Sequence, residues 1–328
     1  MNRETIEHVA RECGFELAGV APVGPLEDFA RYQAWVEREM AGEMRYLIGR
    51  RASLRQDPAN LLEGAQSVIC VGKLYHTGEP AGVHISRYAH ISRYARGPDY
   101  HDVLRDALER MAHRLREIEP FEYKVCVDTA PLLERSLARL AGLGWIGKNT
   151  CLINEPWGSW FFLGELITTL AIPPASPPLD RCGSCTRCID ACPTEALVPD
   201  GDQWTLDSRR CISYLTIELR GPIPEEHHAG MGGLVFGCDI CQDVCPWNSR
   251  APVTAEANFA PRAIPSLEDL ASMTESEFQE FARGTPLGRP KYAGFMRNVA
   301  IAMSNRKAHS PRLPADSGQD ALDSRVDG

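Results

Sequence analysis

Apolar positions in the first 172 residues recur with helical spacing in some stretches and form short continuous runs in others. The helical spacing over 3–13 and 101–118 predicts helices with one buried face, and Pro25 is expected to open another. The short apolar runs predict strands at 15–20, 67–74 and 121–128. Because the two patterns alternate, we expect an α/β (α+β) domain over residues 1–172, in which helices cover a sheet.

The rest of the chain changes character at a proline-rich stretch. Residues 173–180 contain four prolines and predict a stiff linker. A cysteine-rich module is expected over 181–250 and a helical, basic segment over 251–305, in which Thr274 and Glu277 form a capping box. The polar stretch at 306–328 is expected to be a disordered tail.

Eight of the twelve cysteines lie in or between two runs that each end in Cys-Pro. The first run has the spacing C-x2-C-x2-C-x3-C-P, which is typical of ferredoxins with two [4Fe–4S] clusters. The second run lacks its first cysteine, because Val235 stands at that position. Cys211, isolated between the runs, is the natural replacement. The predicted ligands are then Cys182, Cys185, Cys188 and Cys245 for one cluster, and Cys192, Cys211, Cys238 and Cys241 for the other.

Zinc and disulfide bonds are the alternatives for these cysteines. Zinc sites usually have two well-separated C-x2-C pairs, whereas three cysteines at intervals of three followed by Cys-Pro favour a cubane cluster. Disulfides require an oxidising compartment, and the N-terminus lacks the pattern of a signal peptide. We therefore expect a cytoplasmic protein with metal-bound cysteines.

Asp128 is the candidate for catalysis in the first domain. It follows a predicted strand and precedes a predicted helix, a position where sheets often carry active-site residues. The same position is also that of an N-cap, and the pattern alone does not separate the two readings. The nearby G-x-G-x-x-G at 142–147 is weak evidence for a dinucleotide site, since it follows a helix instead of a strand.

Composition narrows the possible partners. The chain is 44% hydrophobic and 24% charged, as in ordinary globular proteins, and it has no apolar run of membrane-spanning length. Its net charge of −9 argues weakly against a polyanionic partner. However, residues 281–312 contain seven arginines and lysines and no acidic residue, which makes a local anion-binding surface plausible.

Seven further motifs are distributed along the chain, at Ile91–His101, Val127–Arg135, Ala141–Lys148, Phe161–Leu166, Arg210–Leu219, Gly237–Asn248 and Leu287–Ser304. Together they resemble the epoxyqueuosine reductase family, the cobalamin-dependent iron–sulfur enzymes that complete queuosine synthesis on tRNA. The resemblance covers roughly residues 5–305. Two departures are a tandem repeat of His-Ile-Ser-Arg-Tyr-Ala at 84–95, whose first copy is expected to bulge as a loop, and the short C-terminus.

The resemblance implies roles for individual residues. Asp128 matches the family's proton donor, which favours catalysis over capping. The residues implied to line the cobalamin are Arg55, Tyr94, Asp128, Leu152, Leu163, Ser213, Glu218, Cys238 and Asp239. Those implied to contact tRNA are Leu219, Arg220, Gly221, Arg289, Arg297 and Asn298.

The implied reaction is the reduction of epoxyqueuosine to queuosine at the wobble position of tRNA. Electrons would pass through the two clusters to cobalamin, and Asp128 would supply a proton. That role requires a protonated carboxyl near neutral pH, which burial beside an apolar corrin would favour. The expected partners are the anticodon stem-loop of the modified tRNA and an electron donor, with the protein a monomer and no membrane involved. Two alternatives are a reductive dehalogenase-like enzyme and a ferredoxin-type electron carrier. The basic run argues against the first, and the large first domain argues against the second.

Overall fold

The computed structural model describes residues 1–78 and 89–309. The loop expected at the first copy of the repeated hexamer, and the tail from residue 310 onward, therefore lie outside the described residues. The tail was expected to begin at 306, but the last helix, α11 (Lys291–His309), continues through that position.

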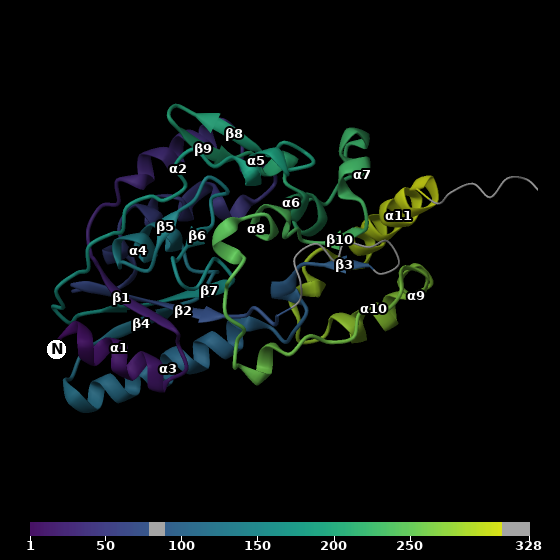
Figure 1. Ribbon diagram of the computed structural model, residues 1–328. Coiled ribbons are helices and arrows are strands. Elements are labelled where there is room, and N and C mark those ends of the chain that lie inside the picture. The colour runs from purple at the N-terminus through teal and green to yellow at the C-terminus, as the bar shows by residue number, and fades with distance from the viewer. Residues whose placement is uncertain (79–88, 310–328) are drawn as a thin grey trace, which may run out of the picture.

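A four-stranded sheet forms the centre of the first part of the chain (Figure 1). Its order is β1-β2-β7-β4, and each pair of neighbouring strands is antiparallel. The predicted α/β (α+β) class is thereby narrowed to α+β. The strand predicted at 67–74 is confirmed with its bounds, and the other two predicted strands are shorter or shifted. The strands are β1 (Leu17–Pro22), β2 (Ser67–Leu74), β4 (Tyr123–Cys126) and β7 (Phe161–Thr168).

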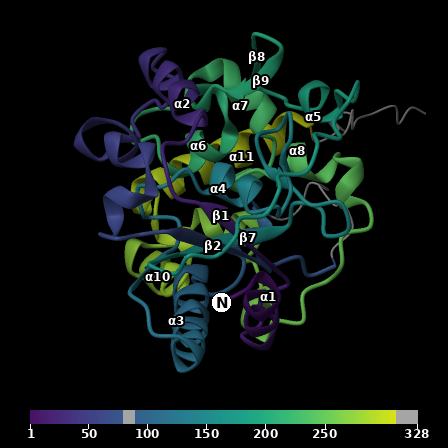
Figure 2. The same ribbon diagram turned by 90° about the vertical axis from the view of Figure 1, so that its left-hand side faces the viewer.

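Helices cover both faces of this sheet (Figures 1 and 2). The helices α1 (Arg3–Glu12) and α3 (Tyr100–Ile118) lie on one face, and α4 (Glu134–Leu140) lies on the other. Alternate residues of β7 divide between the two cores, because successive side chains of a strand point to opposite faces. Phe162 and Leu166 pack with α1 and α3, whereas Phe161 and Ile167 pack with α4.

The second half of the chain is interlocked with the first. Strand β3 (His90–Ile91) pairs in parallel with β10 (Leu234–Phe236), which lies inside the cysteine-rich module. The expected linker is also in contact with the sheet domain, since the amide of Ala175 donates to the carbonyl of Val20 at 2.8 Å. The predicted boundaries therefore mark changes in sequence, and the segments share cores across them.

Shorter elements complete the described part of the chain. The capping box predicted for Thr274 and Glu277 is confirmed at the start of α10. None of the helices among the described residues is both long and apolar enough to cross a bilayer. The remaining helices and strands are α2 (Asp28–Glu37), β5 (Trp145–Ile146), β6 (Leu152–Ile153), α5 (Arg187–Asp190), β8 (Leu197–Asp200), β9 (Gln203–Leu206), α6 (Ile212–Ile217), α7 (Glu225–Met231), α8 (Ile240–Asp243), α9 (Leu267–Ala271) and α10 (Glu275–Ala282).

Candidate active site and metal centres

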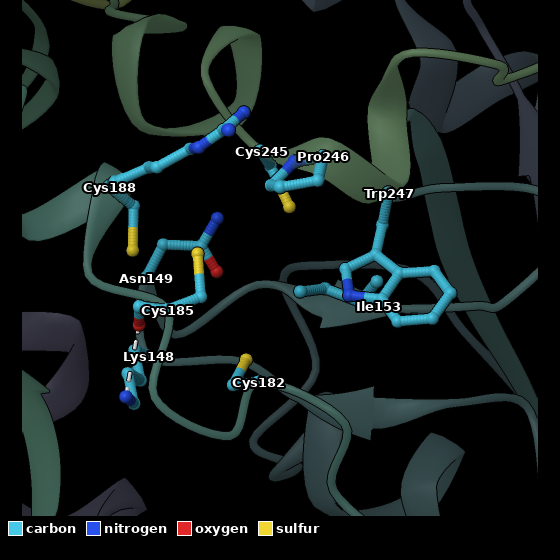
Figure 3. A pocket seen from close by; sticks show the side chains of 10 residues that line it. Lys148, Asn149, Ile153, Cys182, Cys185, Cys188, Cys245, Pro246 and Trp247 are labelled. Carbon is cyan, nitrogen blue, oxygen red and sulfur yellow. Dashed lines mark hydrogen bonds between the residues drawn. The ribbon is translucent and has the colours of Figure 1, made fainter.

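Four cysteines line a small pocket (Figure 3). They are the four that the spacing assigned to the first cluster, Cys182, Cys185, Cys188 and Cys245. Ile153 and Trp247 form an apolar wall beside them. Thiolate ligands around a pocket with an apolar wall are the donor set of a [4Fe–4S] cluster, so the residues present fit that group.

Two short helices bring these cysteines together. Helix α5 ends just before Cys192-Pro193, and α8 ends just before Cys245-Pro246. A proline lacks an N–H group and fixes φ, which stops each helix and turns the chain away. The glycine-rich loop contributes Lys148, whose ammonium donates to the carbonyls of Gly183 and Cys185 at 2.6 and 3.0 Å and so holds the first cysteine loop.

The cysteines assigned to the second cluster are also neighbours. Burial raises the pKa of the Cys238 thiol, and the nearby Cys211 and Cys192 raise it further. The pKa of the Cys241 thiol is also raised, by its hydrogen bond with Cys151 and by burial, and then by Cys238 and Cys211. The sequence left Cys151 without a role, but its thiol lies within hydrogen-bond reach of Cys241. Over residues 1–78 and 89–309, no group of three His, Cys, Asp or Glu side chains is placed to hold a single metal ion.

Asp128 lies in an irregular loop between β4 and α4. Helix α4 begins at Glu134, and its N-cap is Leu133, so the N-cap reading of Asp128 is wrong. The backbone of Asp128 has φ of 51°, an uncommon conformation for a residue with a side chain. Its side chain is 55% exposed. The fold therefore presents the carboxyl to the surface instead of using it to start the helix.

His101 is the hydrogen-bond partner of Asp128. Its Nε2 lies 3.1 Å from Oδ2 of Asp128, and its Nδ1 lies 2.7 Å from Oδ1 of Asp99. The hydrogen bond with Asp128, followed by that with Asp99, raises the pKa of the imidazole to about 9. The imidazole is therefore protonated at neutral pH, between two carboxylates.

This pairing corrects one expectation. Desolvation by the surrounding protein raises the pKa of the Asp128 carboxyl, but the hydrogen bond and charge of His101 outweigh it and leave the pKa below its usual value. A protonated Asp128 was expected at neutral pH. In this structure the carboxyl is ionised and the proton is on the histidine.

Aromatic and charged residues surround this pair. The ring of Tyr100 stacks on Phe162 at 4.2 Å and lies 6.2 Å from the ring of Tyr94. Tyr46 is 43% exposed, and the guanidinium of Arg289 lies 5.2 Å above its ring. Burial, followed by the charge of Glu218, raises the pKa of the Tyr46 phenol to about 12, so it stays neutral. Neutral aromatic rings and the guanidinium of Arg289 therefore lie around Asp128.

The residues expected to line cobalamin divide by exposure. Arg55, Leu152 and Asp239 are buried. Arg55 donates to the carbonyls of Arg51 and Tyr46, and Asp239 accepts from Ser92 and from the backbone and side chain of Arg93. The others, Tyr94, Asp128, Leu163, Ser213, Glu218 and Cys238, keep part of their surface open. Burial, followed by the charges of Asp128, Asp239 and Glu218, raises the pKa of the Tyr94 phenol, so these four residues lie close together.

The residues expected to contact tRNA also divide. Arg289 forms a bidentate ion pair with Glu218 at 3.0 and 3.1 Å, and Arg220 is exposed. Arg297 instead donates to the carbonyls of Leu215, Leu219 and Gly221. The side chain of Asn298 is 0% exposed, which excludes its direct contact with a nucleic acid in this structure.

The acid-free run at 281–312 is also less cationic in space than in sequence. Arg283 pairs with Glu280, Arg289 with Glu218 and Arg306 with Glu268. Glu280 lies immediately before the run and was therefore not part of the acid-free count. The anion-binding surface expected there is consequently reduced to a few residues.

Four residues of the site were not found from the sequence. Asp99 and His101 were overlooked, although an Asp-x-His spacing at a helix start is a recognisable signal. Glu134 and Glu165 were also overlooked. Glu165 is an acid in the middle of an apolar strand, and it is 0% exposed. Such a residue usually has a function or a partner that compensates for its burial.

The chain matches two protein families over parts of its length. Residues 181–248 match the family described as "4Fe-4S double cluster binding domain". Residues 55–129 match the family described as "Epoxyqueuosine reductase QueG, DUF1730".

Similar proteins extend the match to nearly the whole chain. An epoxyqueuosine reductase of Xanthomonas campestris is 42% identical over 94% of this chain and 88% of that protein. A Pseudomonas aeruginosa protein of the same name is 41% identical over 95% of this chain and 88% of its own length.

Solved structures agree. A crystal structure of epoxyqueuosine reductase with an epoxyqueuosine-modified tRNA-Tyr stem loop has a TM-score of 0.82 at 30% identity and covers 93% of this chain and 81% of that one. The Bacillus subtilis enzyme, in a structure with its aspartate-bearing catalytic loop swung out of the active site, gives the same TM-score and identity over 93% and 82%. The identity over nearly the full length places this chain in the epoxyqueuosine reductase family.

Proposed function

We propose that this protein reduces epoxyqueuosine to queuosine in tRNA, at the wobble position. The observation that carries the proposal is the half-exposed Asp128, hydrogen-bonded to a protonated His101 in a chain that also holds two groups of four neighbouring cysteines. Removing the epoxide oxygen as water requires two electrons and two protons. The two groups of cysteines are suited to deliver the electrons, and the Asp128–His101 pair is suited to deliver protons.

The residues present also fit a large redox cofactor beside Asp128. Tyr94, Asp128, Leu163, Ser213 and Glu218 would hold cobalamin through their open surfaces, with Cys238 at its edge. Arg55, Leu152 and Asp239 would support that surface from below, since they are buried. Bound cobalamin would supply cobalt-centred reduction, and the two clusters would supply its electrons.

The first of the two protons that leave with the epoxide oxygen starts on His101, and the second comes from solvent, which recharges the imidazole. Its Nε2 passes the proton over 3.1 Å to Oδ2 of Asp128, which then protonates the departing oxygen. The carboxylate of Asp99 on Nδ1 keeps the imidazole oriented and favours its recharging from solvent. Asp128 is thus the group that touches the substrate, and His101 is the store behind it.

The tRNA would approach across Arg289 and Arg220, with the backbone of Leu219 and Gly221 beside them. Arg289 also influences the pKa of Asp128, so the proposed RNA contact and the proposed acid lie in one region. Arg297 and Asn298 would act indirectly by holding this segment, through bonds to Leu219, Gly221 and Thr216. We place the reaction in the cytoplasm and the enzyme as a monomer that takes electrons from a separate donor.

A reconstitution assay tests the function. The purified protein, loaded with iron–sulfur clusters and cobalamin, is incubated with a reductant and epoxyqueuosine-containing tRNA, and the nucleosides are then analysed. We expect conversion to queuosine. Asp128→Asn should bind the cofactors and abolish turnover, and Asp102→Asn, an exposed acid on the first turn of α3, should behave as wild type. A wild-type protein that forms no queuosine would overturn the proposal, and an active Asp128→Asn variant would overturn the role of the acid.

A further inference from the structure

Two carboxyl groups lie behind the Asp128 loop and have no part in the proposed chemistry. Glu165 is in the middle of β7, opposite Cys70 on β2 and Cys126 on β4. Strand alternation directs it to the face of the sheet that α4 covers, where Cys70, Cys126 and Leu137 form the core. Glu134 is the first residue of α4 and lies over the same face.

Glu165 has an unusual environment for a carboxyl group. It is 0% exposed, and neither of its oxygens receives a hydrogen bond from residues 1–78 or 89–309. The carboxyl of Glu134 lies within hydrogen-bond reach. Two carboxylates have only acceptors, so they can bond to each other only when one of them carries a proton. A buried, unpaired carboxylate would be far more costly than a carboxylic acid.

Glu134 connects this buried acid to the catalytic loop. Its Oε1 accepts the backbone N–H of Asp128 at 2.7 Å. The loop from Val127 to Leu133 contains no helix or strand, and Asp128 has a positive φ. Such a conformation is strained and persists only where surrounding bonds hold it. The bond to Glu134 fixes the amide of the residue whose side chain meets the substrate.

We propose that Glu134 and Glu165 share one proton, and that this acid pair is the anchor that holds the Asp128 loop in its working position. The proposal rests on the function proposed above in one respect, since the working position is the one in which Asp128 can protonate the substrate. Glu165 donates its O–H to Glu134, and Glu134 uses its other oxygen to accept from Asp128. Both acids are positioning residues, because neither reaches the substrate.

The electrostatic surroundings agree with a shared proton. Burial and then the charge of Asp128 raise the pKa of Glu134 to about 8, and burial and then the charge of Glu134 raise that of Glu165 well above its usual value. The other titratable or charged groups that interact with the pair, from β2, β4, α3 and α4, are Cys70, Cys126, His101 and Arg135, and Lys124 acts on Cys126. His101 and Arg135 favour the charged form of Glu134, which leaves the proton on Glu165.

Infrared spectroscopy of the protein with its iron–sulfur clusters bound tests the shared proton directly. Wild type at neutral pH should show a carboxylic-acid carbonyl band that is lost only at alkaline pH, because burial and then the charge of Glu134 raise the pKa of Glu165. Glu165→Gln should lack this band, since its amide donates to Glu134 without a titrating proton. The control Glu63→Gln, an exposed acid, should retain it. A band that persists unchanged in Glu165→Gln overturns the shared proton.

Hydrogen exchange of the peptide 127–133 tests the anchor. After correction for intrinsic exchange rates, wild-type protection should decrease over the alkaline range in which the carboxylic-acid band is lost, whereas Glu165→Gln should stay protected throughout. The same pH dependence in both proteins overturns the anchor. Should Glu165→Gln fail to fold, Glu134→Gln serves instead, because its amide both accepts from Asp128 and donates to Glu165, so protection should not depend on pH. Both measurements need no tRNA, so a failed queuosine assay would leave this inference standing.

Discussion

At the scale of residues, the chemistry depends on which atom holds the proton. Asp128 was identified by its position after a strand, but an ionised carboxylate cannot protonate a leaving oxygen. The imidazole of His101 resolves this, because it stores a proton at neutral pH and lies 3.1 Å from the carboxylate. The proposed acid is therefore the Asp128–His101 pair, and its pH dependence is expected to follow the pKa of the histidine.

Replacing His101 by Asn should lower kcat by about 10- to 100-fold, because Asp128 loses its proton store. The wild-type rate should decrease as the pH rises through about 9, where the imidazole loses its proton. This alkaline limb should be absent in the variant. The pH profile of single-turnover queuosine formation checks this, and an identical profile in the variant would contradict it.

The same histidine links stability to pH. Its folded-state pKa of about 9 is above the ordinary value of 6.5, so its stabilisation is fully present below pH 6.5 and is lost as the pH rises through about 9. Urea unfolding should show a decline in unfolding free energy over this window that is smaller in His101→Asn. A decline of equal size in both proteins would mean that the imidazolium does not stabilise the fold.

Cys211 is the proposed cluster ligand with the weakest sequence evidence, because it belongs to neither run. We expect Cys211→Ala to lose one cluster, which reduces the iron content from about eight to about four atoms per chain. Cys151→Ala is the matched control, since Cys151 contacts Cys241 but is not needed to complete either set of four. Iron analysis with electron paramagnetic resonance checks both variants. Loss of a cluster in Cys151→Ala alone would reassign the ligand.

At the scale of elements, short helices and loops place the functional groups. The helices α5 and α8 end at Cys-Pro and so direct cysteines of both runs toward shared sites. The loop before α4 is held by Glu134, which belongs to the helix itself. Helix α11 carries Asn298, whose amide donates to the carbonyls of Thr216 at 2.8 Å and Val235 at 2.9 Å. It thereby joins α11 to α6 and β10.

Asn298→Ala should destabilise the protein by about 2–4 kcal/mol, because two buried carbonyls lose their donor. Asn298→Asp should be worse, since a carboxylate would face the same carbonyls. Asn258→Ala, an exposed amide bonded to Glu256, should have little effect. Chemical denaturation monitored by circular dichroism measures all three. Equal stability of wild type and Asn298→Ala would remove the joining role.

At the scale of the whole molecule, the two halves of the chain fold as one interlocked structure. The β3–β10 pair crosses from the first half into the cysteine-rich module, and the C-terminal segment contributes Phe259 to the core of the first domain. The cysteine-rich module and the Asp128–His101 pair are therefore held in a fixed relation. The overall charge is −9, so the proposed RNA contact requires local positive charge.

Arg220 is exposed at the proposed RNA surface, and its guanidinium bonds only to the carbonyl of Arg289 among the interactions resolved for it. Arg220→Ala should weaken tRNA binding and reduce the slope of log affinity against log salt by about 1. Arg114→Ala removes a charge from α3, at the opposite side of the molecule from α11 (Figure 1), and should leave the slope unchanged. Filter binding at several salt concentrations distinguishes them, and equal slopes for wild type and Arg220→Ala would contradict the contact.

The local features of this protein could be predicted from its amino-acid sequence alone. Cysteine spacing identified the two groups of four that the structure brings together, and apolar periodicity located α1, α3 and β2. The Thr274–Glu277 capping box is equally local. These features depend on residues a few positions apart, where helix and turn geometry fixes what is near what.

Contacts between residues that are far apart in the sequence could be known only from the folded structure. The antiparallel strand order, the pairing of Arg289 with Glu218 across 71 positions and the burial of Asn298 have no local signal. The proton on His101 belongs to this group, since its partner Asp128 is 27 positions away. A pKa depends on the charges and solvent around a group, and only the folded chain brings these together. The sequence could thus name Asp128, but not its protonation state.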